Sequence, residues 1–278
     1  MKATQLTDAV AYHGEGPMWD AATGRLLWVD LHAGDVLSTD VDGTTTRQHY
    51  ADVAACVAPR AGGGYVVATA RGFSLIDASG AVTPVPDVWD DTGVRMNDGG
   101  CDPHGRFFCG SMAKEQPAPG RGAMWRLDPD LSVTQVFDGV TISNGLEWSP
   151  DGALAYYNDT PTQQVAMCAP DLSSRQPFVS IDAADGHPDG LTVDAAGGVW
   201  VALWGGYAVR RYAPDGELAA VIELPVAQVS SCAFGGSALD TLFITTSAEG
   251  LPNPEPAAGA LFVVQPGVRG MPTRTFAG

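Results

Sequence analysis

The sequence predicts an all-β fold: a six-bladed β-propeller with four antiparallel strands per blade, formed as a single domain over residues 1–278. Short strand-like runs, rich in β-branched and aromatic residues, follow turn signals six times along the chain. The turn glycines at positions 105, 152 and 197 are 47 and 45 residues apart, which is the spacing typical of propeller blades. No long segment shows the periodicity of a helix.

Each repeat contains two strand-like runs bounded by Asp, Pro and Gly, as tight turns require. The first runs of the six units are RLLWVD (25–30), GYVVAT (64–69), RFFCGS (106–111), ALAYYND (153–159), GVWVALW (198–204) and DTLFITT (240–246). The second runs are DVLSTDVDG (35–43), FSLIDASG (73–80), AMWRLDPD (123–130), QVAMCAPD (164–171), AVRRYAPDG (208–216) and ALFVVQPG (260–267).

The N-terminal segment is expected to close the ring. ATQLTDAV (3–10) resembles VTQVFDGV (133–140), so we expect it to be an outer strand that pairs with the last blade. The alternative is that PTRTFAG (272–278) supplies this strand. LPNPEPAAG (251–259) and AKEQPAPGRG (113–122) are predicted to be loops, and no domain boundary is visible.

Composition narrows the class of protein. The chain has 278 residues, of which 45% are hydrophobic, enough for a sizeable core. Its 32 acidic residues outnumber 15 basic ones, for a formal net charge of −17. Such a charge disfavours binding to nucleic acid or to an anionic membrane surface. We expect a monomer, the default for a closed propeller.

No feature indicates export or a membrane span. The N-terminus lacks an apolar stretch typical of a signal peptide, and no apolar run approaches about 18 residues. Five widely spaced cysteines favour buried free thiols and a cytoplasmic location. The five histidines form no HxxxH or HExxH pair, so a histidine-rich metal site has little support.

Polar residues recur at one offset from the first turn of each repeat. Asn97, Asn144 and Asp189 lie eight positions before a turn glycine, and Glu15 lies nine positions before one. The equivalent positions in the other repeats hold Ala55 or Cys56 and Ser231. In a propeller the first strand of each blade lines the central channel, so these side chains should converge on the axis.

Converging carboxylates and amides would repel one another or stay unsatisfied without a cation. The all-oxygen set suits Ca²⁺, Mg²⁺ or Mn²⁺, and does not exclude Zn²⁺ or Fe²⁺. The alternative is that these residues only cap turns, as Asn and Asp often do. Turn chemistry alone would not select a glutamate, so the sequence favours one divalent cation in the channel.

The chain resembles the SMP-30/gluconolactonase/regucalcin-like family along essentially its whole length, and its ALWGG run (202–206) is closer to bacterial aldonolactonases. The resemblance is carried by GEGPMWD (14–20), RMNDGGCDPHGRFFCGSM (95–112), SNGLEWSPDG (143–152), YYNDT (156–160) and PDGLTVDAAGGVWVALWGG (188–206). It implies a six-bladed propeller with a divalent metal in the channel that hydrolyses sugar lactones.

The resemblance also implies roles for individual residues. Glu15, Asn144 and Asp189 match the metal ligands, and Asn97 matches a substrate contact or a fourth ligand. Arg95 matches a substrate-binding arginine, and Glu115 a substrate-contacting acid in some members.

Two further residues have open roles. Asp159 either orients a ligand or ends a strand, and Trp204 either walls the site against a sugar ring or packs in the core.

The expected reaction is the metal-dependent hydrolysis of an aldono-1,4- or 1,5-lactone to the aldonic acid, with Asp189 as general base. Two alternatives remain. One is a metal-dependent esterase or organophosphate hydrolase on the same propeller, and the other is a calcium-binding propeller without catalysis.

Overall fold

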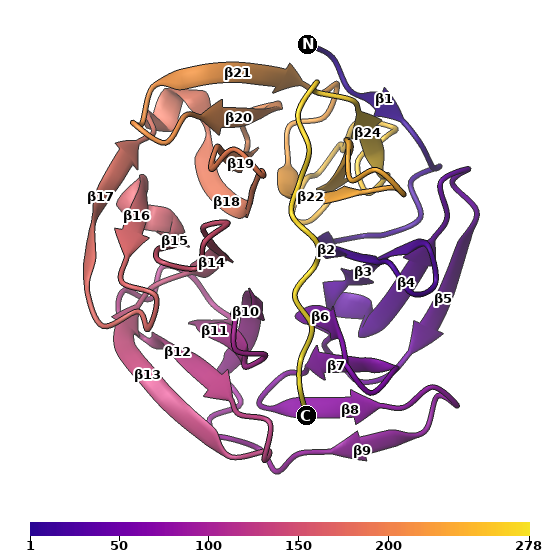
Figure 1. Ribbon diagram of the computed structural model, residues 1–278, viewed down its shortest axis with the longest axis vertical. Helices are drawn as coiled ribbons and strands as arrows, with labels where there is room; N and C mark the ends of the chain where they lie inside the picture. The colour runs from indigo at the N-terminus through magenta and orange to yellow at the C-terminus, as the bar shows by residue number, and fades with distance from the viewer.

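The computed structural model describes residues 1–278 and consists of six four-stranded antiparallel sheets arranged as a ring around a central channel (Figure 1). The six-bladed propeller predicted from the repeat is therefore confirmed. The inner strands β2, β6, β10, β14, β18 and β22 line the channel, and the outermost strands form the perimeter (Figure 1).

Blades one to three run in chain order from the channel outward. They comprise β2 (Gly14–Asp20), β3 (Arg25–Asp30), β4 (Asp35–Thr39) and β5 (Thr45–His49); β6 (Cys56–Pro59), β7 (Tyr65–Ala68), β8 (Phe73–Ile76) and β9 (Val82–Pro84); and β10 (Val94–Cys101), β11 (Phe107–Ala113), β12 (Gly122–Leu127) and β13 (Val133–Val140).

Blades four to six complete the ring. They comprise β14 (Ser143–Trp148), β15 (Ala155–Asp159), β16 (Gln164–Cys168) and β17 (Arg175–Ser180); β18 (His187–Val193), β19 (Val199–Trp204), β20 (Ala208–Tyr212) and β21 (Leu218–Glu223); and β22 (Val229–Gly235), β23 (Thr241–Thr246), β24 (Phe262–Val264) and β1 (Thr4–Gln5). Three single-turn 3₁₀ helices lie in connections: η1 (Leu31–Ala33), η2 (Thr160–Thr162) and η3 (Ala183–Asp185).

The two runs recognised in each repeat are the second and third strands of each blade. The run at 25–30 is β3, and the run at 198–204 contains β19, for example. The inner strands precede these runs, as the offset of the polar residues requires. The predicted loops at 251–259 and 113–122 connect β23 to β24 and β11 to β12.

The N-terminal strand closes the ring. Thr4 and Gln5 of β1 pair antiparallel with Val263 and Phe262 of β24, so the outer strand of blade six comes from the start of the chain. The alternative, in which residues 272–278 supply this strand, is wrong. Joining the two ends of the chain in one sheet hides an edge that would otherwise stay unpaired.

The C-terminal strap, residues 265–278, crosses one end of the channel (Figure 1). Its backbone bonds successive blades: Ala195 N–H donates to Arg269 O, Gly270 N–H to Leu239 O, and Phe276 N–H to Pro59 O. Phe276 is fully buried. The strap therefore ties blades five and six to blade two.

The apolar core lies between neighbouring blades. Trp28, Trp148 and Trp200 are all fully buried. Each indole N–H finds an acceptor, respectively Thr39 Oγ1, Pro170 O and Asp194 Oδ2, all at 2.9 Å. All five cysteines are buried and free, as expected. No helix in the structure has the length and apolar character that a membrane span needs.

Candidate metal and substrate site

Four inner strands deliver the predicted polar residues to the channel. Glu15 lies on β2, Asn97 on β10, Asn144 on β14 and Asp189 on β18, and all four are buried. They line one cavity of about 190 Å³. The other lining residues are His13, Arg95, Met112, Ile142, Thr160, Trp204 and Glu249.

A β-bulge lies at the predicted polar residue of each of these strands. The register with the neighbouring strand shifts between Glu15 and Met18, between Met96 and Gly99, between Asn144 and Leu146, and between Pro188 and Leu191. A bulge bends the strand and re-aims a side chain. By contrast, β6 pairs with β7 without a shift and carries no polar residue.

Arg95, Asn97 and Asn144 form a hydrogen-bonded chain across two blades. Arg95 Nη1 donates to Asn97 Oδ1 at 2.6 Å, and Asn97 Nδ2 donates to Asn144 Oδ1 at 2.9 Å. Asn144 Nδ2 in turn donates to Thr160 Oγ1 at 2.7 Å. The chain fixes the orientation of both amides, because the oxygen of each accepts from the preceding member and the nitrogen of Asn144 is held by Thr160.

Acidic side chains are concentrated in the channel. Burial raises the pKa of Asp189 well above its usual range, and repulsion from Glu15 and Asp98 raises it further. The pKa of Glu15 is raised by burial and by Asp98, and burial raises the pKa of Asp98 to about 6. Arg95 is the cation that faces these groups, and burial lowers its own pKa.

A divalent cation fits this donor set. Buried carboxylates that repel one another are stable as anions only when a positive charge compensates them. Glu15, Asn144 and Asp189 offer oxygen atoms alone, which hard cations such as Ca²⁺ and Mg²⁺ prefer. The residues of the channel thus suit the group that the sequence predicts there.

The structure distributes the remaining predicted residues unevenly. Arg95 and Trp204 line the cavity, so Trp204 forms part of its wall. Glu115 is exposed in the loop between β11 and β12 and does not line the cavity, so its contact with substrate stays a prediction. Asp159 ends β15, and its carboxylate accepts from the backbone N–H groups of Thr141 and Ile142.

Sequence reasoning missed three polar residues of the cavity. Thr160 lies in η2 and connects Asn144 to blade five, because its hydroxyl donates to Pro188 O at 2.8 Å. His13 and Glu249 come from opposite ends of the chain and lie together at the cavity. No local spacing signals this pair, because only ring closure brings blades one and six together.

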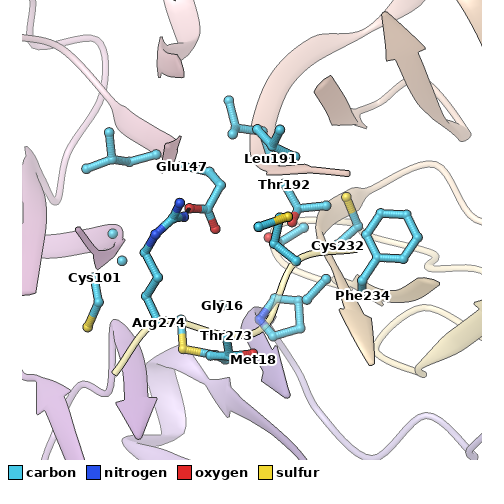
Figure 2. Close-up of a pocket in the computed structure, with 18 of the residues that line it drawn as sticks. Gly16, Met18, Cys101, Glu147, Leu191, Thr192, Cys232, Phe234, Thr273 and Arg274 are labelled. Atoms are coloured by element: carbon cyan, nitrogen blue, oxygen red, sulfur yellow. Dashed lines mark hydrogen bonds and ion pairs between the residues drawn. The ribbon is translucent and has the colours of Figure 1, made fainter. Parts of the chain in front are cut away.

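A smaller cavity, of about 60 Å³, lies on the strap side of the channel (Figure 2). Met271, Pro272, Thr273 and Arg274 of the strap form one of its walls. Arg274 pairs with Glu147 of β14, as Figure 2 shows. This cavity shares no lining residue with the one that holds Glu15 and Asp189.

Comparison with known proteins assigns the family. The profile of the SMP-30/Gluconolactonase/LRE-like region matches residues 13–248. The chain belongs to the SMP-30/gluconolactonase/LRE-like family. Regucalcin from Danio rerio is 35% identical, with 95% of each chain covered.

Solved structures of similar fold carry names from the same family. The calcium-binding protein regucalcin from Agrobacterium tumefaciens superposes with a TM-score of 0.91 at 26% identity, covering 100% of this chain and 98% of that one. A gluconolactonase from Xanthomonas campestris gives a TM-score of 0.76 at 26% identity, covering 94% and 88%. The first of these structures is named for calcium binding and the second for gluconolactonase activity, a name that the family of this chain also carries.

Proposed function

We propose that the protein hydrolyses an aldono-1,4- or 1,5-lactone to the aldonic acid in a reaction that requires one divalent cation. The observation that carries this proposal is the channel cavity itself. It joins three oxygen ligands, Glu15, Asn144 and Asp189, to a guanidinium and an amide that can bind hydroxyl groups. The family membership and the similarity to a gluconolactonase support it.

A bound cation would supply Lewis-acid chemistry, polarising the lactone carbonyl and favouring ionisation of a nearby water. We assign the cation to Glu15, Asn144 and Asp189. Thr160 holds the Asn144 amide by its nitrogen, which leaves the Asn144 oxygen directed to the cavity. That oxygen also accepts from Asn97 Nδ2 at 2.9 Å.

Asp189 is the proposed general base. Its carboxylate lies in the cavity wall and would take the proton of the attacking water, then return it to the ring oxygen that leaves. The backbone of Asp189 is fixed from blade four, because Asn158 Nδ2 donates to Asp189 O at 2.6 Å. This contact fixes the backbone from which the carboxylate projects.

Arg95 and Asn97 are the proposed contacts for the hydroxyl groups and ring oxygen of the sugar. One Arg95 nitrogen is already used to donate to Met96 O and Asn97 Oδ1, which orients the rest of the guanidinium. Trp204 gives the sugar ring an apolar wall. We propose Glu115 as a further contact, one that its loop would have to bring to the cavity.

The decisive experiment is a panel of aldonolactones on chelator-stripped protein with Ca²⁺, Mg²⁺, Mn²⁺ or Zn²⁺ added back. We expect turnover only after a cation is restored. Asp189→Ala should abolish turnover, and Asp189→Asn should lower kcat by about 10²- to 10⁴-fold, because it keeps an oxygen ligand but cannot accept the proton.

Wild-type rates in Asp189→Ala would disprove the role of this residue. Faster hydrolysis of aryl esters or phosphotriesters than of every lactone would replace the proposed substrate. If a chelator lowers the unfolding temperature but no substrate is turned over, the cation is purely structural.

A further inference from the structure

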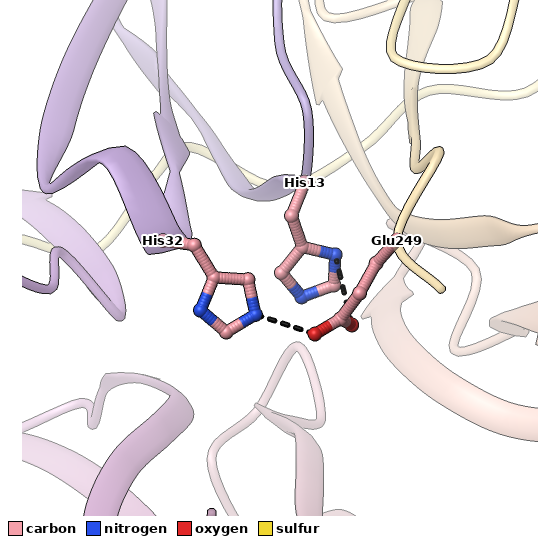
Figure 3. Close-up of side chains that lie close together, drawn as sticks. All are labelled: His13, His32 and Glu249. Carbon is pink, nitrogen blue, oxygen red and sulfur yellow. Dashed lines mark hydrogen bonds and ion pairs between the residues drawn. The ribbon is translucent and has the colours of Figure 1, made fainter. Parts of the chain in front are cut away.

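A second cluster of metal-binding side chains lies beside the channel cavity, formed by His13, His32 and Glu249 (Figure 3). His13 directly precedes β2, His32 lies in η1 of blade one, and Glu249 follows β23 of blade six. Each residue offers one ligand atom, and these atoms all lie within 4.8 Å of one another. None of the three belongs to the set proposed to hold the channel cation.

The geometry of the three side chains matches a ligand set. His32 Nε2 hydrogen-bonds Glu249 Oε1, and His13 Nδ1 lies 3.6 Å from Glu249 Oε2 (Figure 3). The two imidazole rings stack, with centroids 5.1 Å apart. Two ligands of one tetrahedral Zn²⁺ ion stand about 3.3 Å apart, so small side-chain rotations would bring all three onto a single ion.

The surroundings leave room for an ion and partly fix its ligands. His13 is buried, its Nδ1 lies 2.7 Å from Ser247 Oγ, and its ring lies against Trp204 with centroids 5.7 Å apart. His32 and Glu249 are each about one-third exposed, so the cluster is open to solvent on one side. His13 and Glu249 also line the cavity, which provides space on the other side.

We propose that His13, His32 and Glu249 form a second cation site, selective for a borderline transition-metal ion of the Zn²⁺ class. Two imidazoles and one carboxylate are the protein ligands of open zinc sites, whereas Ca²⁺ and Mg²⁺ prefer oxygen alone. The two sites therefore differ in chemistry. Glu15, Asn144 and Asp189 offer oxygen ligands, whereas the solvent-exposed end of the cavity at His13, His32 and Glu249, its mouth, offers mainly nitrogen ligands.

A cation at the mouth would lie beside the path to the channel site, because His13 is two residues from Glu15 and both line one cavity. Arg95 also faces Glu249 and opposes a cation there, so the site is expected to be weaker than a closed structural zinc site. A soluble Zn²⁺ ion would thus bind reversibly at this end of the propeller.

Equilibrium dialysis of the chelator-stripped protein against Zn²⁺ tests the proposal, with bound metal counted by mass spectrometry. We expect the wild type to bind one more Zn²⁺ per chain than His32→Gln or Glu249→Gln. Either substitution should lower the affinity for that Zn²⁺ ion by at least tenfold. His49→Gln is the matched control. His49 also contacts a carboxylate, Asp35, but no second histidine lies with them, so its loss should leave the stoichiometry unchanged.

X-ray absorption of the zinc-loaded protein distinguishes the two sites. The channel ligands include no histidine, so imidazole scattering reports only the cluster at the mouth. We expect this scattering in the wild type and in His49→Gln, and its loss in His32→Gln at an unchanged unfolding temperature of the metal-free protein. Equal Zn²⁺ stoichiometry in all variants, or zinc without imidazole ligands in the wild type, would overturn the proposal and leave the cluster as a hydrogen-bonded link between blades one and six.

Discussion

Gly145 and Gly190 each follow a proposed metal ligand, and neither position has room for a side chain. A Cβ on Gly190 would lie 2.1 Å from Ser231 Oγ, and a Cβ on Gly145 would lie 2.8 Å from Asp189 O. Each glycine therefore lets the inner strand of one blade approach the inner strand of the next. The glycine beside each polar residue thus brings the proposed ligands of adjacent blades closer together, as the proposed cation site requires.

Gly190→Ala should destabilise the protein and disturb Asp189. The new methyl group meets backbone and Cβ atoms of Ser231, which cannot move without shifting β22, so we expect a loss of about 1–3 kcal/mol in the free energy of unfolding. Urea denaturation measures this loss. Gly62→Ala is the control, because a Cβ there meets nothing within 4 Å. Equal effects of the two substitutions would contradict the role of close strand approach.

At the residue scale, the convergence of the proposed ligands on one cavity could be predicted because they occupy similar positions in one repeat. Asn144 and Asp189 share one offset from a turn glycine and Glu15 lies one residue farther from its own, so the repeat was enough to bring them to one cavity. His32 and Glu249 could not be found in this way, since they are 217 residues apart and lie in irregular connections. Their contact depends on loop conformation, which the repeat does not specify.

At the scale of the element, the turn between β18 and β19 is organised by one buried carboxylate. Asp194 accepts from the backbone N–H groups of Ala196 and Gly198, from Trp200 Nε1, and from Arg211 Nε at 2.7 Å. The Asp194 side chain is fully buried. The Asp194 carboxylate thus stabilises the turn, accepts a hydrogen bond from the buried Trp200 indole and links the turn to β20 through Arg211.

Asp194→Ala should cost about 3–5 kcal/mol in the free energy of unfolding at pH 7, because it leaves the Arg211 guanidinium and the indole N–H without a partner. Burial alone would raise the pKa of Asp194, but the hydrogen bonds from Arg211 and Trp200 outweigh it and lower the pKa. A lowered pKa means that the stabilisation is complete above the ordinary carboxyl pKa of about 3.9 and is lost as the pH falls through the lower folded value.

The difference between the wild type and Asp194→Ala should therefore narrow below about pH 4, as measured by urea denaturation at pH 7 and pH 3. The control is Asp215→Ala in the exposed turn of the same blade, where the carboxylate accepts only from Glu217 N at 3.2 Å. We expect its effect to stay within about 0.5 kcal/mol at either pH. A constant Asp194 difference across this range would show that the stabilisation does not depend on the charge.

The second and third strands of each blade were the most predictable elements. Each run of the repeat is bounded by turn residues and is rich in β-branched or aromatic side chains, so its position and length follow from local chemistry. The strap was not predictable, because residues 265–278 form no regular element. Its path depends on Phe276 and Arg274 finding partners in blades that lie far away in the sequence.

At the scale of the whole molecule, the C-terminal strap links blades on opposite sides of the ring. Phe276 is fully buried, and its backbone bonds both Pro59 and Ala61 of blade two. Phe276→Ala should lower the free energy of unfolding by about 3–5 kcal/mol through lost burial and a residual cavity. Thr275→Ala, at an exposed strap position, is the control and should be nearly neutral.

Thermal and urea unfolding of these two variants test whether the strap stabilises the ring through Phe276. The assignment fails if the Phe276 and Thr275 substitutions have the same effect. The channel site lies at the other end of the ring, so Phe276→Ala should keep its cation affinity at temperatures where the protein stays folded.

The strap also bears on how small molecules enter and leave the channel. Because it crosses one end of the channel, we expect a small molecule to reach Asp189 through the opposite end and the product to leave by the same route. An acid still leaving this dead-end passage excludes the next molecule of lactone. The proposed lactonase should therefore be inhibited competitively by its own product, the aldonate.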